Sequence, residues 1–195
     1  TLLRTLAGYQ KPLAGKMDEV SPETLGVVLT ERMDAMGLSV REVVAMGRHP
    51  YTGYFGRLTA EDEQTVDKAM SLTHTEEFAN RAFQSLSDGE RQKVMIAKAL
   101  AQETPVIYLD EPTAFLDFPS KVEMMQLLHQ LSRQTDKTIF LSTHDLELAL
   151  QIADKIWLMD KVNGVTIGTP EDLSLNGSLS NFFARKGIAF DLETG

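Results

Sequence analysis

The chain has 195 residues, a formal net charge of −9, 43% hydrophobic residues and no cysteine. These values fit a soluble globular protein with one good core, or one core and a small attached lobe, and they exclude disulfides and thiolate metal sites. The acidic balance argues against a general nucleic-acid binder, and no apolar run approaches the roughly 18 residues of a membrane span.

The first predicted helix begins at residue 1, with three leucines at helical spacing, and ends at Gly8, a natural C-cap. Turn residues follow, and then a short apolar strand is expected over Leu25 to Leu29, with Glu31 just beyond it. The phosphate-binding pattern G-x-x-x-x-G-K-[ST] does not occur in the 195 residues, since the segment 14–17 fails on both spacing and hydroxyl.

A helical region follows. The segment Val40 to Gly47 is apolar at helical spacing and stops at glycine, which predicts a short amphipathic helix. The segment Arg48 to Arg57 is rich in turn residues and aromatics. Thr59 then begins another helix, with acids in its first turn, that runs to about Met70.

Two motifs stand about twenty residues apart. The first, Leu86-Ser87-Asp88-Gly89-Glu90, is a small polar turn that opens a helix running to Ala101, so its free backbone N–H groups form a phosphate-binding end. The second is an apolar run from Val106 that ends on Asp110 and Glu111, as a buried strand does when it brings acids to a sheet edge. Such a pair is suited to a nucleotide site, where one carboxylate holds magnesium and the other orients water.

Helices and strands then alternate. A helix is expected over 121–134, a buried strand over 138–142 that leads into Thr143-His144, a helix over 146–153, and a strand over 156–159 before a hairpin-like turn at 163–164. This alternation favours an α/β sheet with parallel crossovers.

In this order the two motifs resemble the signature and Walker B motifs of ATP-binding cassette (ABC) ATPases. In that family the string T-L-L-R-x-L-A-G, present here from Thr1, directly follows the P-loop, so the resemblance implies that a P-loop region precedes this sequence. The implied fold is a P-loop NTPase-like, mostly parallel sheet flanked by helices, with an α-helical signature lobe. We expect one incomplete ABC domain over 1–195, with the lobe at about 32–102, the core sheet at about 103–168 and a tail at 169–195.

The resemblance also implies roles for residues of the core. Asp110 is expected to hold Mg²⁺ and Glu111 to act as the base that orients the attacking water. His144, which ends the neighbouring strand, is expected to reach the γ-phosphate. Glu31 stands where the family has a glutamine that touches magnesium, so it is a second candidate for the metal, and Thr1 follows the P-loop lysine and hydroxyl.

The other half of the site is supplied in trans in this family. Ser87, Gly89 and Glu90 are expected to contact the ATP of a second subunit in a head-to-tail dimer, although the usual L-S-G-G-Q reads L-S-D-G-E here. Asp117, in a segment that resembles the D-loop, is expected at the dimer interface. The cofactors implied are therefore ATP and Mg²⁺.

The pattern G-R-x-P-x-x-G-x-x-G-R-L-x-x-x-D at 47–62 resembles the ABC subgroup that imports iron–siderophore, haem and cobalamin complexes. This implies membrane permease subunits as partners, an indirect link to a substrate-binding protein, and a peripheral location on the cytoplasmic face of the inner membrane. The segment Arg41 to Arg57 is expected to receive a helix of the membrane subunit.

A non-transport ABC ATPase would usually carry tandem cassettes or coiled-coil insertions, neither of which is visible, and a regulatory module without a working P-loop is a further alternative. A Ser-His-Asp hydrolase using His144 lacks the G-x-S-x-G elbow.

Overall fold

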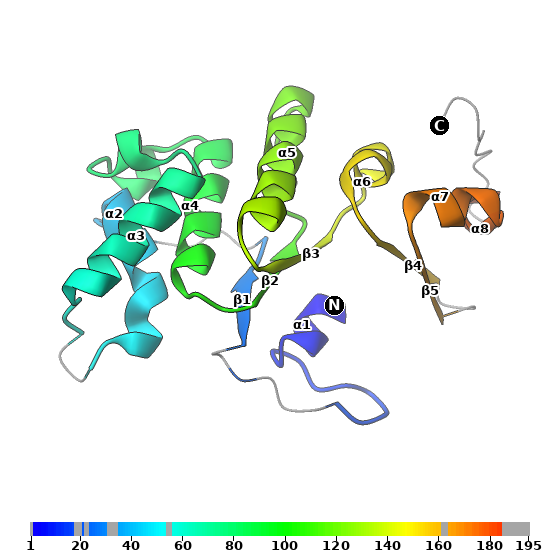
Figure 1. The fold of residues 1–195 in the computed structure, drawn as a ribbon, viewed down its shortest axis with the longest axis horizontal. Coiled ribbons are helices and arrows are strands. Elements are labelled where there is room, and N and C mark those ends of the chain that lie inside the picture. The colour runs from blue at the N-terminus through cyan, green and yellow to red at the C-terminus, as the bar shows by residue number, and fades with distance from the viewer. Residues whose placement is uncertain are drawn as a thin grey trace. The chain divides into compact units, whose positions relative to one another are not determined.

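The computed structural model describes residues 2–17, 21, 24–30, 35–53, 56–160 and 164–184. The chain forms two compact units, residues 1–143 and 144–195. The first unit holds a parallel sheet and a helical lobe, and the second holds a β-hairpin with short helices (Figure 1). The finer subdivision expected from the sequence stays a prediction.

A three-stranded parallel sheet forms the centre of the first unit. Its order is β1 (Leu25–Val28), β2 (Val106–Asp110) and β3 (Thr138–Ser142), so β2 lies between the other two strands. The last residue of β2 is paired in register with the last residue of β3. Because the strands run in parallel, their carboxyl ends meet at one edge of the sheet.

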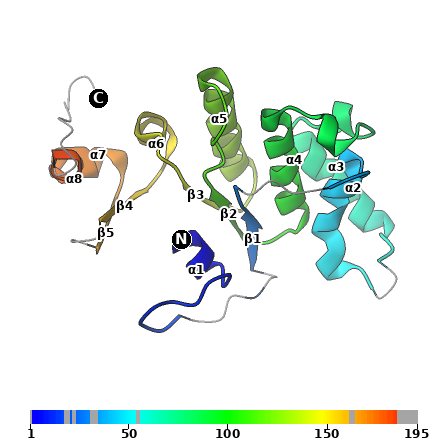
Figure 2. The same cartoon turned by 180° about the vertical axis from the view of Figure 1, so that it is seen from behind.

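Helices flank this sheet. In both cartoon views α5 (Phe118–Gln134) lies on one side of it and α1 (Leu2–Leu6) on the other (Figures 1 and 2). α5 starts three residues earlier than predicted, because Asp117 accepts a hydrogen bond from the Ser120 backbone N–H and Pro119 occupies the first turn.

The chain between β1 and β2 forms the helical lobe. Its elements are α2 (Val40–Ala45), the 3₁₀ helices η1 (Met46–Tyr51), η2 (Glu76–Phe78) and η3 (Phe83–Ser85), and the longer helices α3 (Ala60–Leu72) and α4 (Asp88–Ala101). The helices α2, α3 and α4 pack on one another (Figure 2). Their fully buried side chains include Val40, Val43, Val44, Val66, Met70, Val94 and Ile96.

Local sequence signals set the start of each of these three helices. Each begins with a reciprocal capping box, in which a hydroxyl at the N-cap and a carboxylate three residues later bond each other's backbone N–H. The pairs are Ser39 with Glu42, Thr59 with Asp62, and Ser87 with Glu90.

The second unit contains α6 (Leu146–Ile152), the antiparallel strands β4 (Ile156–Asp160) and β5 (Gly164–Gly168), and the helices α7 (Pro170–Leu175) and α8 (Ser178–Ala184). Leu158, Leu173 and Leu179 form its small apolar core.

Candidate nucleotide site

The carboxyl end of β2 carries Asp110, whose position is fixed from both neighbouring strand ends. Its backbone carbonyl accepts a hydrogen bond of 2.6 Å from the hydroxyl of Thr30, two residues after β1. Its carboxylate Oδ1 accepts a hydrogen bond of 2.9 Å from the hydroxyl of Ser142, the last residue of β3. Asp110 is therefore held at the sheet edge where open α/β sheets bind their ligands.

Glu111 follows in a left-handed backbone conformation, with φ of 49°. A non-glycine residue in this region is uncommon and is often found at functional sites. The backbone N–H of Glu111 donates to the hydroxyl of Ser142 over 3.0 Å, and its carbonyl accepts the N–H of Ala114 in the turn that follows. One hydroxyl thus contacts both residues of the acidic pair.

Asp110 offers at this edge a carboxylate of the kind that magnesium takes as a ligand. The Asp110 side chain is 18% exposed, and its Oδ2 lies 3.9 Å from Nε of Arg4 in α1. Mg²⁺ typically takes one or two carboxylates from a protein and completes its shell with water and phosphate oxygens. Asp110 is the residue of this edge that would hold the ion.

The signature motif forms the N-terminal end of α4. The backbone N–H and the hydroxyl of Ser87 both donate to Oε2 of Glu90, over 2.7 and 2.8 Å. The backbone N–H of Glu90 in turn donates to the hydroxyl oxygen of Ser87 over 3.3 Å. These bonds from Ser87 lower the pKa of Glu90, so its carboxyl is ionised at neutral pH. Ser87 is therefore held as the N-cap by its own motif.

Arginines balance the two acids of this motif. Asp88 lies 3.3 Å from Arg91 one turn along α4, and Glu90 lies 3.4 Å from Arg81. The negative charge that distinguishes L-S-D-G-E from the family's usual motif is thus offset locally. Gly89 has room for a larger residue within the chain, because an added Cβ would lie 3.8 Å from Leu116.

A hollow of about 170 Å³ brings three regions of the first unit together. It is lined by residues that follow β1, by the first turns of α4 and by the turn after β2, among them Thr30, Asp88 and Phe115. The end of β1, the signature motif and the segment that resembles the D-loop are therefore neighbours.

Asp117 caps α5 at the end of that segment. Its carboxylate accepts the Ser120 N–H over 3.0 Å, which lowers the pKa of Asp117. The aromatic side chains on either side, Phe115 and Phe118, are 76% and 62% exposed. Large apolar groups in such positions are typical of a surface that another molecule covers.

The roles of all the predicted site residues stay predictions, and three of these residues are not part of the geometry described above. Thr1 and Glu31 lie outside the described residues. His144 is the first residue of the second unit, whereas Asp110 and Glu111 belong to the first.

The residues that support the acidic pair were not predicted from the sequence. Ser142 was seen only as a strand residue, and Thr30 and Arg4 were not assigned a role. The signal for Ser142 is its place as the last residue of the strand beside β2, since parallel strands in register bring such residues to the same edge.

Comparisons with known proteins show the family of this chain. Residues 1–114 match the family model described as ABC transporter. An uncharacterized ABC transporter ATP-binding protein of Methanocaldococcus jannaschii is 43% identical, over the whole of this chain and 71% of that protein. A petrobactin import ATP-binding protein of Bacillus anthracis is 38% identical, over the whole of this chain and 75% of that protein. A solved structure of a putative metal-chelate type ABC transporter superimposes with a TM-score of 0.82 at 31% identity, covering 94% of this chain and 73% of that one.

The chain belongs to the ABC transporter family. It is an ABC-type, ATP-binding ATPase, and the predicted P-loop NTPase-like fold and the resemblance to metal-chelate importers are both confirmed. Among the described residues, no helix is long and apolar enough to cross a membrane.

Proposed function

We propose that this protein is the ATP-hydrolysing subunit of an importer that takes up a metal chelate of the iron–siderophore, haem or cobalamin type. The observation that carries the proposal is the edge of the sheet, where Ser142 contacts both Asp110 and Glu111. The importer assignment is supported by relatives named for petrobactin and cobalamin import and by the metal-chelate type neighbour.

The candidate site residues have different roles in hydrolysis. Mg²⁺, when bound at Asp110, would neutralise charge on the phosphate groups. Glu111 orients the water and takes its proton. Ser142 holds the carboxylate of Asp110 and the backbone of Glu111. Ser87 and the N–H groups at the start of α4 cap the γ-phosphate of an ATP held by a second subunit. Asp117 lies at that dimer interface, and His144 contacts the γ-phosphate from its own subunit.

The partners of this subunit are a second copy arranged head to tail and integral membrane permease subunits, with a substrate-binding protein acting through the permease. The subunit sits peripherally on the cytoplasmic face of the membrane. Its surface for the permease is the segment Arg41 to Arg57, in which Tyr51 is 47% exposed. Tyr54 and Phe55 of this segment lie outside the described residues, and Arg48 is buried, so it belongs to the interior of the lobe and not to the contact surface.

The test is ATP-driven uptake by the full-length protein reconstituted in vesicles with its permease and binding protein. The probes are radiolabelled ferric hydroxamate, ferric catecholate, haem and cobalamin, each with and without ATP and Mg²⁺. We expect ATP- and Mg²⁺-dependent accumulation of one of them. Hydrolysis of ATP with no accumulation of any probe would instead indicate a non-transport ABC ATPase.

A further inference from the structure

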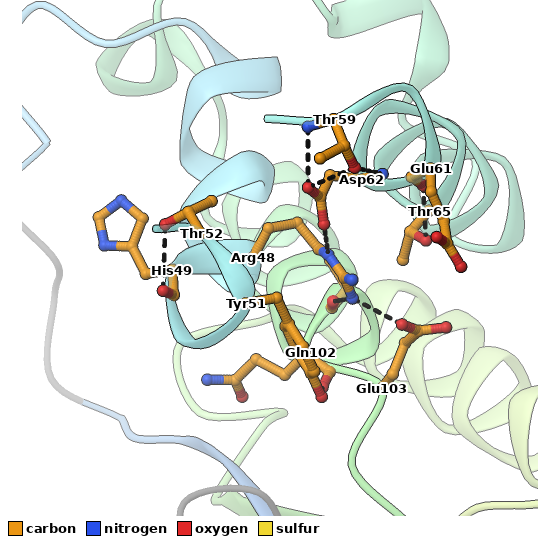
Figure 3. Close-up of polar contacts among 11 residues, drawn as sticks. Arg48, His49, Tyr51, Thr52, Thr59, Glu61, Asp62, Thr65, Gln102 and Glu103 are labelled. Atoms are coloured by element: carbon orange, nitrogen blue, oxygen red, sulfur yellow. Dashed lines mark hydrogen bonds and ion pairs between the residues drawn. The ribbon is translucent and has the colours of Figure 1, made fainter. Parts of the chain in front are cut away.

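A buried arginine joins the proposed permease surface to the end of the signature helix. The Arg48 side chain in η1 is 5% exposed. Its Nε donates to Oδ1 of Asp62 over 2.8 Å, and its Nη1 donates to the carbonyl of Ala101 over 2.8 Å and to Oε2 of Glu103 over 2.7 Å (Figure 3). A single guanidinium therefore binds α3, the last residue of α4 and the segment that leads into β2.

This arrangement caps the C-terminal end of α4 from outside the helix. The last carbonyls of a helix have no partner within it. Here Arg48 binds the carbonyl of Ala101, and the hydroxyl of Tyr51 binds the carbonyl of Gln102 over 2.6 Å. The guanidinium carbon lies 4.1 Å from the centre of the Tyr51 ring, so the two capping side chains also hold each other (Figure 3). We call Arg48, Tyr51, Asp62 and Glu103 the Arg48 clamp.

The backbones of η1 and α4 are also in close contact. A Cβ added at Gly47 would lie 2.3 Å from the carbonyl oxygen of Lys98 and 3.0 Å from the side chain of Ala101. Only a glycine allows this approach without moving one of the two backbones. The Arg48 clamp thus fixes η1 onto the last turn of α4.

The other end of α4 carries Ser87 and Gly89, which are proposed to contact nucleotide. A helix of 14 residues spans roughly 20 Å, and this one is buried along much of its length in the lobe. When η1 is displaced, we therefore expect α4 to move with it as one rigid helix. Stability alone does not require charges at this place, because well-packed apolar residues can replace a buried ion pair without loss.

We propose that Arg48 is a positioning residue for transport, which holds η1 and α4 together so that permease movement at η1 is carried to the signature motif. This inference rests on the proposed function, because it assumes that η1 contacts the permease. Arg48 acts through α4 and touches neither nucleotide nor substrate.

The test compares transport with hydrolysis in the reconstituted importer. The variant Arg48→Met with Asp62→Asn removes the clamp without leaving a buried charge unpaired, and the asparagine keeps an oxygen for the α3 cap. We expect the number of chelate molecules transported per ATP hydrolysed to fall about tenfold, within the usual range of coupling between distant sites. Hydrolysis by the subunit without the permease should remain within about twofold of wild type, since no group of the sheet edge is changed.

Lys137→Met is the matched control. Lys137 is also a part-buried cation that donates to a carbonyl between α4 and β2, that of Thr104 over 2.6 Å, but it reaches this segment from the start of β3 and not from η1. The Lys137→Met variant should have a lower melting temperature and unchanged transport per ATP. A purely structural role for Arg48 would give the same result as this control.

Covalent rescue provides a second readout. Because these 195 residues contain no cysteine, Tyr51→Cys and Gln102→Cys can be introduced in the Arg48→Met, Asp62→Asn background and joined with a short bismaleimide. The same two cysteines in the wild-type background are the reference, because Tyr51 also belongs to the proposed permease surface. We expect the cross-link to restore transport per ATP, because it replaces the lost connection between η1 and the end of α4.

The outcomes separate the two proposals. If the wild-type importer transports a probe and the Arg48→Met, Asp62→Asn variant transports as much per ATP, the role of Arg48 is wrong. The same follows if the cross-link forms but does not restore transport per ATP. Neither result affects the proposed function. If the wild-type importer accumulates none of the four probes, the proposed function fails and this inference falls with it.

Discussion

The hydroxyl of Ser142 donates a hydrogen bond of 2.9 Å to the carboxylate of Asp110. The same oxygen accepts the backbone N–H of Glu111, so a residue at the end of β3 fixes the geometry of an acidic pair at the end of β2. The relation of Asp110, the proposed metal ligand, to Glu111, the proposed base, therefore depends on a side chain that belongs to neither motif.

Ser142→Ala should lower the rate of ATP hydrolysis by about tenfold or more while leaving ATP binding intact, as the loss of an outer-shell partner typically does. Steady-state hydrolysis and nucleotide binding measured on the full-length protein check this. Ser132→Ala is the control, because that hydroxyl binds a carbonyl within α5 and is not at the sheet edge. Equal rates in the two variants would mean that Ser142 has no part in catalysis.

Glu111→Gln should stop hydrolysis, with a loss of at least about a hundredfold, because an amide cannot accept the proton of the attacking water. Binding of ATP should remain, since the change preserves the shape of the side chain. The full-length protein would be assayed by phosphate release and by retention of labelled ATP. Wild-type turnover in this variant would show that another residue is the base.

Ser87→Ala and Ser39→Ala form a matched pair, because both serines are N-caps in capping boxes of lobe helices. Each replacement should lower the free energy of unfolding by about 1 kcal/mol. Only Ser87→Ala should also slow ATP hydrolysis, since α4 is the lobe helix whose first turn is proposed to contact nucleotide. Denaturant unfolding and hydrolysis assays on the two variants separate the effects, and equal hydrolysis in both would remove Ser87 from the site.

Gly89→Ala tests whether the signature glycine is needed by the fold or by the ligand. The added Cβ meets only Leu116 at 3.8 Å, so the variant should fold with equal or greater stability, by up to about 1 kcal/mol from helix propensity. ATP-dependent dimerisation, followed by size-exclusion chromatography, should nevertheless weaken. Gly47→Ala provides the contrast, because its Cβ would collide with the Lys98 carbonyl and should cost about 1–3 kcal/mol of stability.

Acid should weaken the Arg48 clamp in a defined range of pH. Hydrogen bonds from the backbone and hydroxyl of Thr59, and then from Arg48, lower the pKa of Asp62 from 3.8 to about 2. Because the folded-state pKa lies below the unfolded one, this stabilisation is complete above pH 4 and is lost as the pH falls toward 2. Denaturant unfolding at several pH values should show a decline over this range that is smaller in Asp62→Asn. Identical declines would show that other carboxyls control acid unfolding.

Local patterns in the sequence predicted most of the fold. The apolar run before Asp110 and Glu111 is β2. The sequence also predicts which side of α4 is buried, and the structure buries all of its apolar members, which are Val94, Ile96, Ala97, Ala99 and Leu100. In α5 the three-residue steps of Val122, Met125, Leu128 and Leu131 predict one apolar stripe. Val122 is only half-buried, and Met124 and Leu127 are buried outside the stripe. These two are buried as well because α5 contacts both α4 and β3, and a single helical stripe describes only one such contact.

The supporting residues of the site were harder to predict, because their partners are distant in the sequence. Ser142 and Asp110 are 32 positions apart, and Arg48 and Ala101 are 53. The spacing of residues within one helix or strand cannot predict a contact between such distant positions. The segment Arg41 to Arg57 is predicted to be a contact surface, yet its Arg48 is buried. An arginine can enter a core when acceptors there bind its N–H groups.

The insertion of the lobe between β1 and β2 sets an order for folding. Thr30 and Asp110 are neighbours in space but 80 positions apart in the chain, so pairing of the first two strands must close a long loop. The capping boxes of α2, α3 and α4 each span only three residues and need no distant partner. Helices that form first within the lobe shorten the loop that remains, because closure entropy grows with its length. We therefore expect the parallel sheet, and with it the acidic pair, to be completed after the lobe has folded.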